Sequence, residues 1–142
     1  MSSLDYFTYA GDVGKYGLET LGYSQAVRVP PGSRVEVSGQ AGGWDPETHE
    51  VSSDVSAQID QAFSNIQLAL TTAGVKDGLS SVFSIKSYHV GFAEDHEEIF
   101  KAMKKNFEKW MPGHKPIWTL LGVARLGMAD MKVEIDVVAW EK

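Results

Sequence analysis

The stretch PIWTLLGVARLGMADMKVEIDVVAW, residues 116–140, decides the fold because it holds two apolar runs around a turn that carries Gly and Asp. The β-branched and aromatic content of the runs predicts strands at Trp118–Ala124 and Lys132–Trp140. Side chains of the second strand alternate between two faces. One face is wholly apolar and consists of Val133, Ile135, Val137 and Ala139. The other carries Lys132, Glu134, Asp136, Val138 and Trp140. The apolar face suits a layer of helices, and the two acids point away from it.

Two amphipathic helices are predicted to form that layer. Between Asp54 and Ala73, apolar residues recur at the 3.6-residue spacing of one helix face. Ser53 or Asp54 can cap the start of this helix, and Gly74 stands where a left-handed C-terminal cap is common. The second helix is predicted from Glu94 to Trp110, and its apolar positions are Ile99, Met103, Phe107 and Trp110.

The remaining strands complete the predicted fold. Their β-branched and aromatic content places them at Tyr6–Ala10, Ser24–Val29, Arg34–Ser38 and Val82–Val90. The order is then strands, helix, strand, helix and two strands. This order indicates an α+β domain with a mixed six-stranded sheet and two helices packed on one face. At 142 residues the chain is expected to form a single domain, residues 1–142.

Composition excludes several classes of protein. Apolar content of 43% and charged content of 23% are those of a globular protein, and no run of about 18 apolar residues offers a membrane span. The absence of cysteine excludes thiolate chemistry, and the spacing of the four histidines (His49, His89, His96 and His114) assembles no metal site, so neither metal nor cofactor is expected. The acidic opening residues argue against a secretory or mitochondrial leader, so a cytoplasmic location is expected. The net charge of −6 argues against nucleic-acid binding.

The second face of the sheet raises the question of assembly. Two helices cover one face, and the other meets solvent or another copy of the chain. Val138 and Trp140 beside the acids favour a second copy, because a wide exposed apolar patch is costly. We therefore expect an oligomer whose sheet faces line a shared interior, with the acids at or near a cleft.

Several segments in order resemble the Rid family, also called the YjgF/YER057c/UK114 family and labelled the L-PSP endoribonuclease family. They are YSQAVRV (23–29), VEVSGQ (35–40), AFSNIQLALTTAG (62–74) and the closing P-x-W-T, VARL and KVEID. The resemblance covers residues 22–140. It implies a chorismate-mutase-like fold, a homotrimeric barrel with ligand clefts between subunits, and hydrolysis of reactive 2-imino acids to 2-keto acids and ammonia.

The resemblance also implies a set of site residues. The family's cleft tyrosine falls on Tyr23, with Gly22 where the family has proline, and its SGQ segment falls on Ser38, Gly39 and Gln40. The glycine carbonyl would bind the imine nitrogen. The acid that handles the proton falls on Glu134, and the backbone amide of Leu120 holds the place of an anion-binding donor. Arg125, in VARL, matches a separate family arginine and is not taken as a replacement for the cleft arginine.

One position departs from the family in a way that matters chemically. Imine deaminases carry, two residues after the proline, an arginine that forks onto the substrate carboxylate; here that position is Trp118. Indole has one N–H donor and no positive charge, so it cannot hold a carboxylate in this way. Trp118 either stacks against an aromatic, heterocyclic or cationic ligand, or fills the cleft and leaves the site inactive.

Glu134 and Asp136, two apart on a strand, share a face at a spacing of roughly 7 Å. Paired carboxylates of this kind can serve as acid and base. The alternative for Asp136 is an ion pair, with Lys132 or Arg125, at a contact between subunits. Trp44 lies in a loop that either borders the cleft or caps the end of the barrel.

Three hypotheses of function follow. The first is a trimeric Rid-like protein that binds or hydrolyses an imine, an enamine or a related carbonyl compound, with a substrate preference altered by Trp118. The second is a non-catalytic ligand-binding or interaction protein of the same fold. The third, an endoribonuclease or translation inhibitor, is the least favoured because the chain is acidic and lacks a basic groove.

Overall fold

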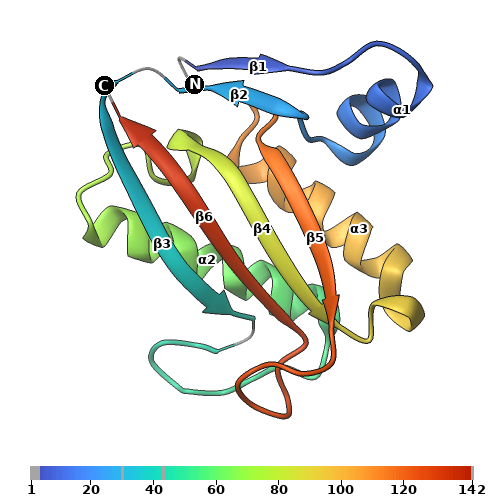
Figure 1. Cartoon of the computed structure of the whole chain (residues 1–142). Coiled ribbons are helices and arrows are strands. Elements are labelled where there is room, and N and C mark those ends of the chain that lie inside the picture. Colours follow the sequence, from blue (N-terminus) through green and yellow to red (C-terminus); the bar gives the residue numbers. More distant parts are fainter. Residues whose placement is uncertain (1–3, 30, 43, 142) are drawn as a thin grey trace.

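The computed structural model describes residues 4–29, 31–42 and 44–141 of the chain. Its centre is a four-stranded mixed sheet in the order β3-β6-β4-β5, and two long helices, α2 and α3, cover one face of it (Figure 1). The strands are β3 (Ser33–Ala41), β4 (Val82–Val90), β5 (Ile117–Val123) and β6 (Val133–Glu141). Strand β6 pairs antiparallel with β3 and β4, whereas β4 and β5 are parallel. The predicted α+β class with both helices on one face is confirmed.

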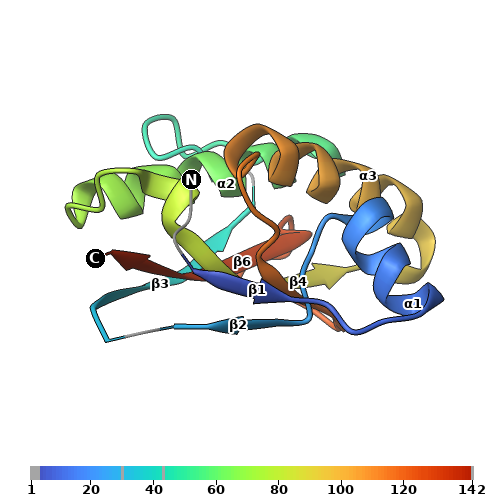
Figure 2. The same ribbon diagram turned by 90° about the horizontal axis from the view of Figure 1, so that it is seen from above.

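The predicted single sheet of six strands is wrong in one respect. The first two strands, β1 (Asp5–Phe7) and β2 (Ala26–Arg28), form a separate two-stranded sheet that crosses one end of the large sheet (Figures 1 and 2). Between them lie a short helix α1 (Asp12–Lys15) and a π-helical turn η1 (Tyr16–Leu21), which the sequence did not predict. A bridge from Ser24 to Ile117 links this region to β5. Because β1 and β2 have three residues each, they are too short to extend the main sheet along its length.

Helix α2 (Val55–Thr72) begins and ends as predicted. The Asp54 carboxylate accepts a hydrogen bond from the Ala57 amide at 2.7 Å, which caps the first turn. Gly74 has a φ of 87°, the left-handed conformation that follows a helix end. The buried positions of α2 fall on the face predicted from the apolar spacing, and they include two polar residues, Gln58 and Asn65.

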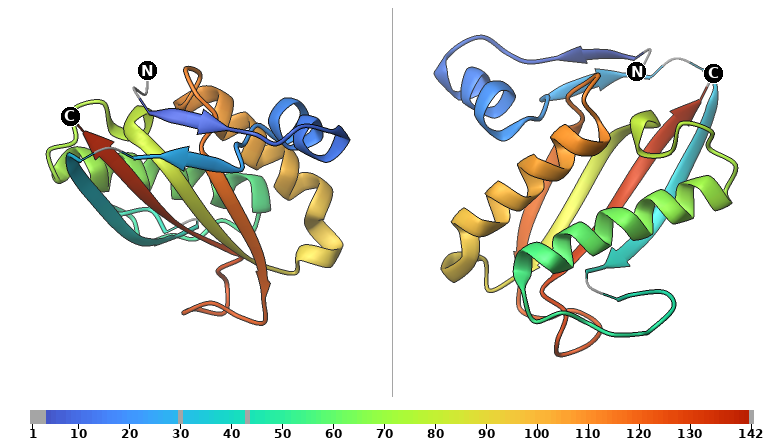
Figure 3. Two further views of the ribbon diagram at one scale, coloured as in Figure 1. Left: turned by 45° about the horizontal axis from the view of Figure 1, so that its top comes forward. Right: turned by 180° about the vertical axis from the view of Figure 1, so that it is seen from behind.

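Helix α3 (Phe92–Trp110) starts two residues earlier than predicted. Gly91 takes a φ of 73° directly after β4, so the chain turns there and the helix begins at once. Acidic residues lie in the first turn as expected, where the positive end of the helix dipole stabilises their negative charge. Seen from behind, α2 and α3 lie side by side across the sheet (Figure 3). Within the described residues, no helix combines the length and apolarity needed to cross a bilayer.

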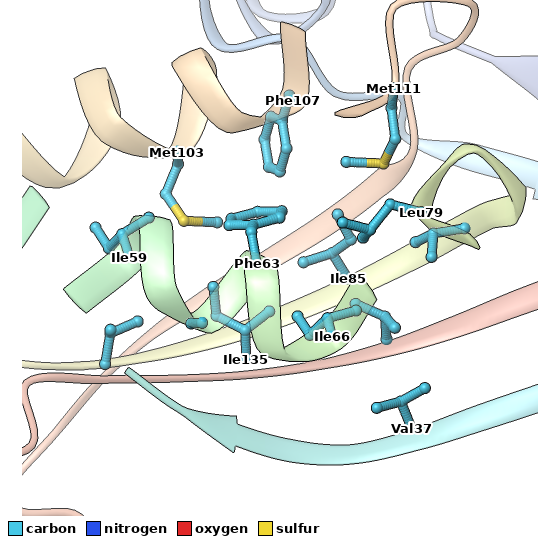
Figure 4. Close-up of a cluster of buried hydrophobic side chains, with 14 of the residues drawn as sticks. Val37, Ile59, Phe63, Ile66, Leu79, Ile85, Met103, Phe107, Met111 and Ile135 are labelled. Atoms are coloured by element: carbon cyan, nitrogen blue, oxygen red, sulfur yellow. The ribbon is translucent and has the colours of Figure 1, made fainter. Parts of the chain in front are cut away.

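The hydrophobic core lies between the helices and the sheet. Phe63 of α2 packs against Phe107 of α3, with ring centroids 6.0 Å apart, over Ile85 and Ile135 of the sheet (Figure 4). The predicted alternation of β6 is confirmed, because its helix-facing positions are all 1% exposed or less: Val133, Ile135, Val137 and Ala139.

The opposite face of the sheet is partly covered by the chain itself. Trp140 is 7% exposed and packs with Leu4 and Phe83, and Val138 contacts the same cluster. The prediction that Trp140 calls for a second copy is therefore wrong: the N-terminal segment covers it. Leu121 of β5, which pairs with Tyr88 on this face, is 44% exposed.

Candidate functional site

Two residues of the predicted site, Glu134 and Gly39, are in contact. The β3–β6 register shifts between Val37 and Gln40, which places Gly39 in a β-bulge. A Cβ at Gly39 would lie 2.0 Å from Oε1 of Glu134, so the carboxyl group occupies the space that any other residue at position 39 would fill. Within the described part of the chain, no hydrogen bond or ion pair engages the Glu134 carboxylate. The carboxylate is therefore free to meet a ligand.

Glu134 forms part of the wall of a pocket of about 620 Å³. The pocket lies where β3 and β6 meet helix α2 and the loops that follow β3 and β5, and these two loops lie at the same end of the sheet (Figures 1 and 3). Twelve of the described residues line it: Gly39, Gln40, Ala41, Trp44, Pro46, Asn65, Leu68, Ala69, Gly127, Met128, Met131 and Glu134. Glu134 is the one charged side chain among them.

Two buried amides on α2 hold the loops around this pocket. Asn65 donates from Nδ2 to the backbone oxygen of Trp44 at 2.8 Å, which fixes the loop after β3. Gln58, fully buried, donates to the backbone oxygens of Ser52 (2.7 Å) and Asp130 (2.9 Å). Its Oε1 accepts from the amide of Lys132 at 2.8 Å. The pocket walls are thus tied to a helix of the core rather than left as free loops.

Trp118 lies on the other face of the sheet from Glu134. It pairs with Ile85 of β4, whose side chain is buried beneath the helices. Its ring meets the rings of Tyr23, Phe100 and Phe107 edge-on, with centroids 5.9, 6.2 and 5.1 Å away. Trp118 therefore belongs to a partly buried cluster of aromatic side chains at the edge of the core.

The indole N–H of Trp118 is hydrogen-bonded to a pair of buried polar side chains, Ser87 and His89. Its Nε1 donates to the Ser87 hydroxyl at 2.8 Å, and that hydroxyl lies 2.9 Å from Nε2 of His89. Burial lowers the pKa of His89 to about 4, so the ring is neutral near pH 7 and can accept the Ser87 proton. The indole N–H therefore has a partner inside the protein and is not available to a ligand.

Tyr23 reaches Trp118 because of the turn before it. Gly22 has a φ of 82° and ends the π-helical turn η1. Proline, with φ near −65°, cannot take that conformation. The glycine in place of the family's proline thus follows from the local backbone. Gly17 gives the Tyr23 ring its room, since a Cβ there would lie 3.0 Å from Cζ.

The predicted site residues fall into two groups in one chain. Tyr23, Trp118 and Leu120 lie along β5 and the helix-facing side of the sheet. Ser38, Gly39 and Glu134 lie on β3 and β6, and strand β4 separates β6 from β5. Ser38 lines a separate, more polar pocket of about 370 Å³ on the face away from the helices, which Asp136 also lines. Within one chain, the group of Tyr23, Trp118 and Leu120 and the group of Ser38, Gly39 and Glu134 therefore do not form one common site.

Asp136 has a partner other than those predicted. The Tyr88 hydroxyl donates to Asp136 Oδ2 at 3.0 Å, and this bond is the first cause of a raised Tyr88 pKa. Lys132 instead pairs with Asp95 at 3.8 Å, and Arg125 donates to the backbone oxygen of Leu126. Within the described chain Asp136 is thus hydrogen-bonded to a tyrosine, and its ion pair with Lys132 or Arg125 at a contact between subunits stays a prediction. Among the residues described, no group of three or more His, Asp or Glu side chains is placed to hold a metal.

Sequence reasoning missed most of the pocket. Leu68, Met128 and Met131 gave no signal as site residues, because they come from a helix and a loop far apart in the sequence. The sequence allows two places for Trp44, the border of the cleft or the end of the barrel, and in the structure Trp44 lies in the pocket wall. Ser87, the hydrogen-bond partner of Trp118, lies 31 residues before it in the sequence. The contact between the two side chains follows only from the register of β5 on β4.

The fold is that of the YjgF-like α+β proteins. The family model described as endoribonuclease L-PSP matches residues 18–141, so the chain belongs to this family, and its predicted Rid/YjgF membership is confirmed. No curated protein matches the chain.

Solved structures show the same relationship. A Rid-family protein of unknown function, YyfB from Yersinia pestis, is 21% identical with a TM-score of 0.81, over 97% of this chain and 98% of that one; this likeness concerns the fold. RidA from the Antarctic bacterium Psychrobacter sp. is 31% identical over 84% of this chain and 88% of that one, with a TM-score of 0.65. Escherichia coli TdcF with bound serine is 26% identical over 87% and 97%, with a TM-score of 0.69.

Proposed function

We propose that this Rid/YjgF protein binds, and hydrolyses, an imine, an enamine or a related carbonyl compound that needs no carboxylate anchor. In this hydrolysis, water oxygen bonds to the C=N carbon. Glu134 takes one proton from this water and passes it to the nitrogen, which gives a carbinolamine. The carbinolamine hydroxyl then loses its proton to the nitrogen by way of Glu134, the C–N bond breaks, and ammonia or an amine leaves while the carbon becomes a carbonyl. Both protons come from the water and nothing is oxidised or reduced, so no cofactor is needed.

The observation that carries the proposal is the position of Glu134. Its carboxylate lies at the wall of a pocket, beside the backbone of Gly39, without a partner in the described chain. A carboxylate kept for structure is normally paired or hydrogen-bonded, as Asp136 is by Tyr88. The acid that the resemblance assigns to proton handling is thus also the one that the pocket leaves unengaged.

Trp118 supports an altered substrate preference. Serine, the ligand of TdcF, carries a carboxylate, and the Rid resemblance places an arginine for such a group at position 118. Here the indole N–H is bonded to Ser87 and the ring packs against Phe107. An amino-acid-derived carboxylate would find no guanidinium there, and a charged hydrogen bond of roughly 1.5–3 kcal/mol would be lost.

We further infer that the chain assembles as a homotrimer, as the resemblance implies. In one chain the Tyr23–Trp118 group and the Gly39–Glu134 group are separated by β4. A cleft between subunits would allow the β5 edge of one chain to complete the Glu134 pocket of the next. The exposed Leu121 on β5 supports an interface on this side of the sheet.

A non-catalytic ligand-binding protein is the second candidate. The buried Trp118–Ser87–His89 chain favours it, because it converts a substrate-binding position of the family into part of the protein interior. The endoribonuclease role is not proposed: the net charge of −6 opposes binding to a polyanion.

Turnover assays on matched imines test the proposal. We expect 2-aminoacrylate and other imino acids to be hydrolysed little faster than in buffer, and an imine without a carboxylate to be hydrolysed measurably faster. Glu134→Gln should lower the latter rate by roughly 10²–10⁴. Asp136→Asn, on the same strand and face, is the matched control and should retain the rate.

Trp118→Arg is the complementary gain of function and should raise hydrolysis of imino acids, provided that circular dichroism shows an intact fold. Rapid wild-type turnover of imino acids, unchanged by Trp118→Arg, would contradict the proposed role of Trp118. No turnover of any imine would favour the non-catalytic candidate.

A further inference from the structure

Three large exposed apolar side chains lie together at the pocket beside Glu134. Eight large hydrophobic side chains are exposed among the described residues, and three of them line this pocket. They are Trp44, Leu68 and Met128, with 41%, 52% and 46% of their surface exposed. They come from a loop, a helix and a second loop, so their proximity is a product of the fold. Apolar side chains gathered in a concavity are typical of a ligand site rather than of ordinary surface.

The charge of the pocket is one-sided. Glu134 is the single ionisable side chain of the twelve lining residues, and no lysine, arginine or histidine accompanies it. Lys132, two residues before it, is turned to Asp95 at 3.8 Å. An anionic ligand would meet an uncompensated carboxylate, whereas a cationic ligand would gain a charged hydrogen bond. The face of Trp44 adds a surface to which a cation is attracted.

The pocket has the size and rigidity of a small-molecule site. Its volume of about 620 Å³ falls within the usual range for such sites, roughly 300–1,000 Å³. The buried amides of Asn65 and Gln58 tie its loops to helix α2. A ligand therefore finds the walls already in place, which lowers the entropy lost on binding. The methionine lining adapts to ligands of different outline.

We propose that this pocket selects an apolar organic cation, an aromatic or alkyl amine or the protonated imine derived from one, with its nitrogen at Glu134 and its apolar body between Trp44, Leu68 and Met128. This inference rests on the proposed function and narrows its substrate class. The apolar body replaces the carboxylate as the group that holds the ligand. A preference for cations is the opposite of what a carboxylate-anchored site would show.

Three probes with the same phenyl ring test this selectivity: 2-phenylethylamine, 2-phenylethanol and 3-phenylpropionate. Binding to the purified full-length chain is measured by calorimetry and tryptophan fluorescence at low ionic strength. We expect the amine to bind at least about tenfold more tightly than the acid, the scale of one charged contact. Glu134→Gln should remove the difference between amine and alcohol while the alcohol still binds.

The variants also locate the site. Trp44→Ala and Met128→Ala should each weaken all three probes by about threefold to tenfold, and the exposed Met128 keeps the test valid if Trp44→Ala disturbs its loop. Glu108→Gln, on the exposed surface of α3, is the charge-matched control and should change nothing.

Tighter binding of the acid, binding of the amine unaffected by Glu134→Gln, or no binding of any probe at millimolar concentration would each overturn the proposal. Binding is measured without turnover, so its outcome is separate from that of the enzymatic proposal. Amine binding without imine hydrolysis would leave this pocket assignment standing and remove the proposed catalysis.

Discussion

Gly39→Ala tests whether the position of the Glu134 carboxylate matters. The new methyl group would lie 2.0 Å from Oε1, 2.8 Å from Cδ and 2.9 Å from Cγ of Glu134, whereas ordinary contact begins at 3.4 Å. Oε1 must therefore retreat by about 1.4 Å. The backbone at Gly39 needs no positive φ, so alanine is tolerated there and the whole perturbation acts on the carboxylate.

The effects on stability and on function should separate. Glu134 can change rotamer at a cost of about 0.5–1.5 kcal/mol. Replacing glycine recovers about 0.4–1 kcal/mol through the unfolded chain. The free energy of unfolding should thus change by less than about 1 kcal/mol. A reacting group misplaced by about 1 Å costs on the order of 10²-fold in rate, so imine hydrolysis should fall by about that factor.

Urea unfolding and turnover on one preparation provide the measurement. Gly127→Ala is the matched control, because Gly127 lines the same pocket and a Cβ there meets nothing within 4 Å. It should leave both quantities unchanged. If Gly39→Ala retained the wild-type rate in a folded protein, the carboxylate position would be irrelevant to the chemistry. If it lost more than about 2 kcal/mol of stability, Glu134 would be a structural acid.

Further expectations follow from the assembly, the core and the buried polar groups. Sedimentation at micromolar concentration should give about three times the chain mass of 15.6 kDa, and a stable monomer would contradict the intersubunit cleft. Gln58→Ala leaves three backbone groups without their partner and should lower the free energy of unfolding by about 2–4 kcal/mol in urea, while Ser64→Ala, at an exposed position of the same helix, should cost little. Burial lowers the folded-state pKa of His89 from 6.5 to about 4, so the unfolded chain binds more protons between these values. The free energy of unfolding should therefore fall by up to about 3 kcal/mol as the pH falls from 6.5 to 4. This decline should be smaller in His89→Gln, and an equal decline in both proteins would place its cause elsewhere, for instance at His114, whose pKa burial also lowers. Tyr88→Phe removes the hydrogen bond to Asp136 and should cost about 1 kcal/mol in urea without affecting ligand binding, whereas loss of binding would move the functional acid from Glu134 to Asp136.

The sequence by itself determined the elements with strong periodicity. The sequence predicts helix α2 to within a residue at each end because an apolar stripe runs along it, although Gln58 and Asn65 are also buried there. It predicts β4 in full from β-branched and aromatic content, although Ser87 and His89 are buried on the helix-facing side of that strand. The faces of β6 followed from alternation alone, since a strand has no other way to separate apolar and charged side chains. The short helix α1 and the turn η1 escaped prediction because their segment has no apolar period, and the two-residue error at Phe92 came from the turn at Gly91.

The tertiary structure decided what the site residues touch. Resemblance named Glu134, Gly39 and Trp118 one by one, but their surroundings depend on register and on contacts between distant segments. The bulge in β3 brings Gly39 into contact with Glu134. The parallel register of β5 on β4 places the indole N–H of Trp118 where it donates a hydrogen bond to Ser87. Amides of α2 hold the two loops that close the pocket. Local pattern encodes which face a side chain takes; which partner it meets there is set by packing between segments that the sequence keeps far apart.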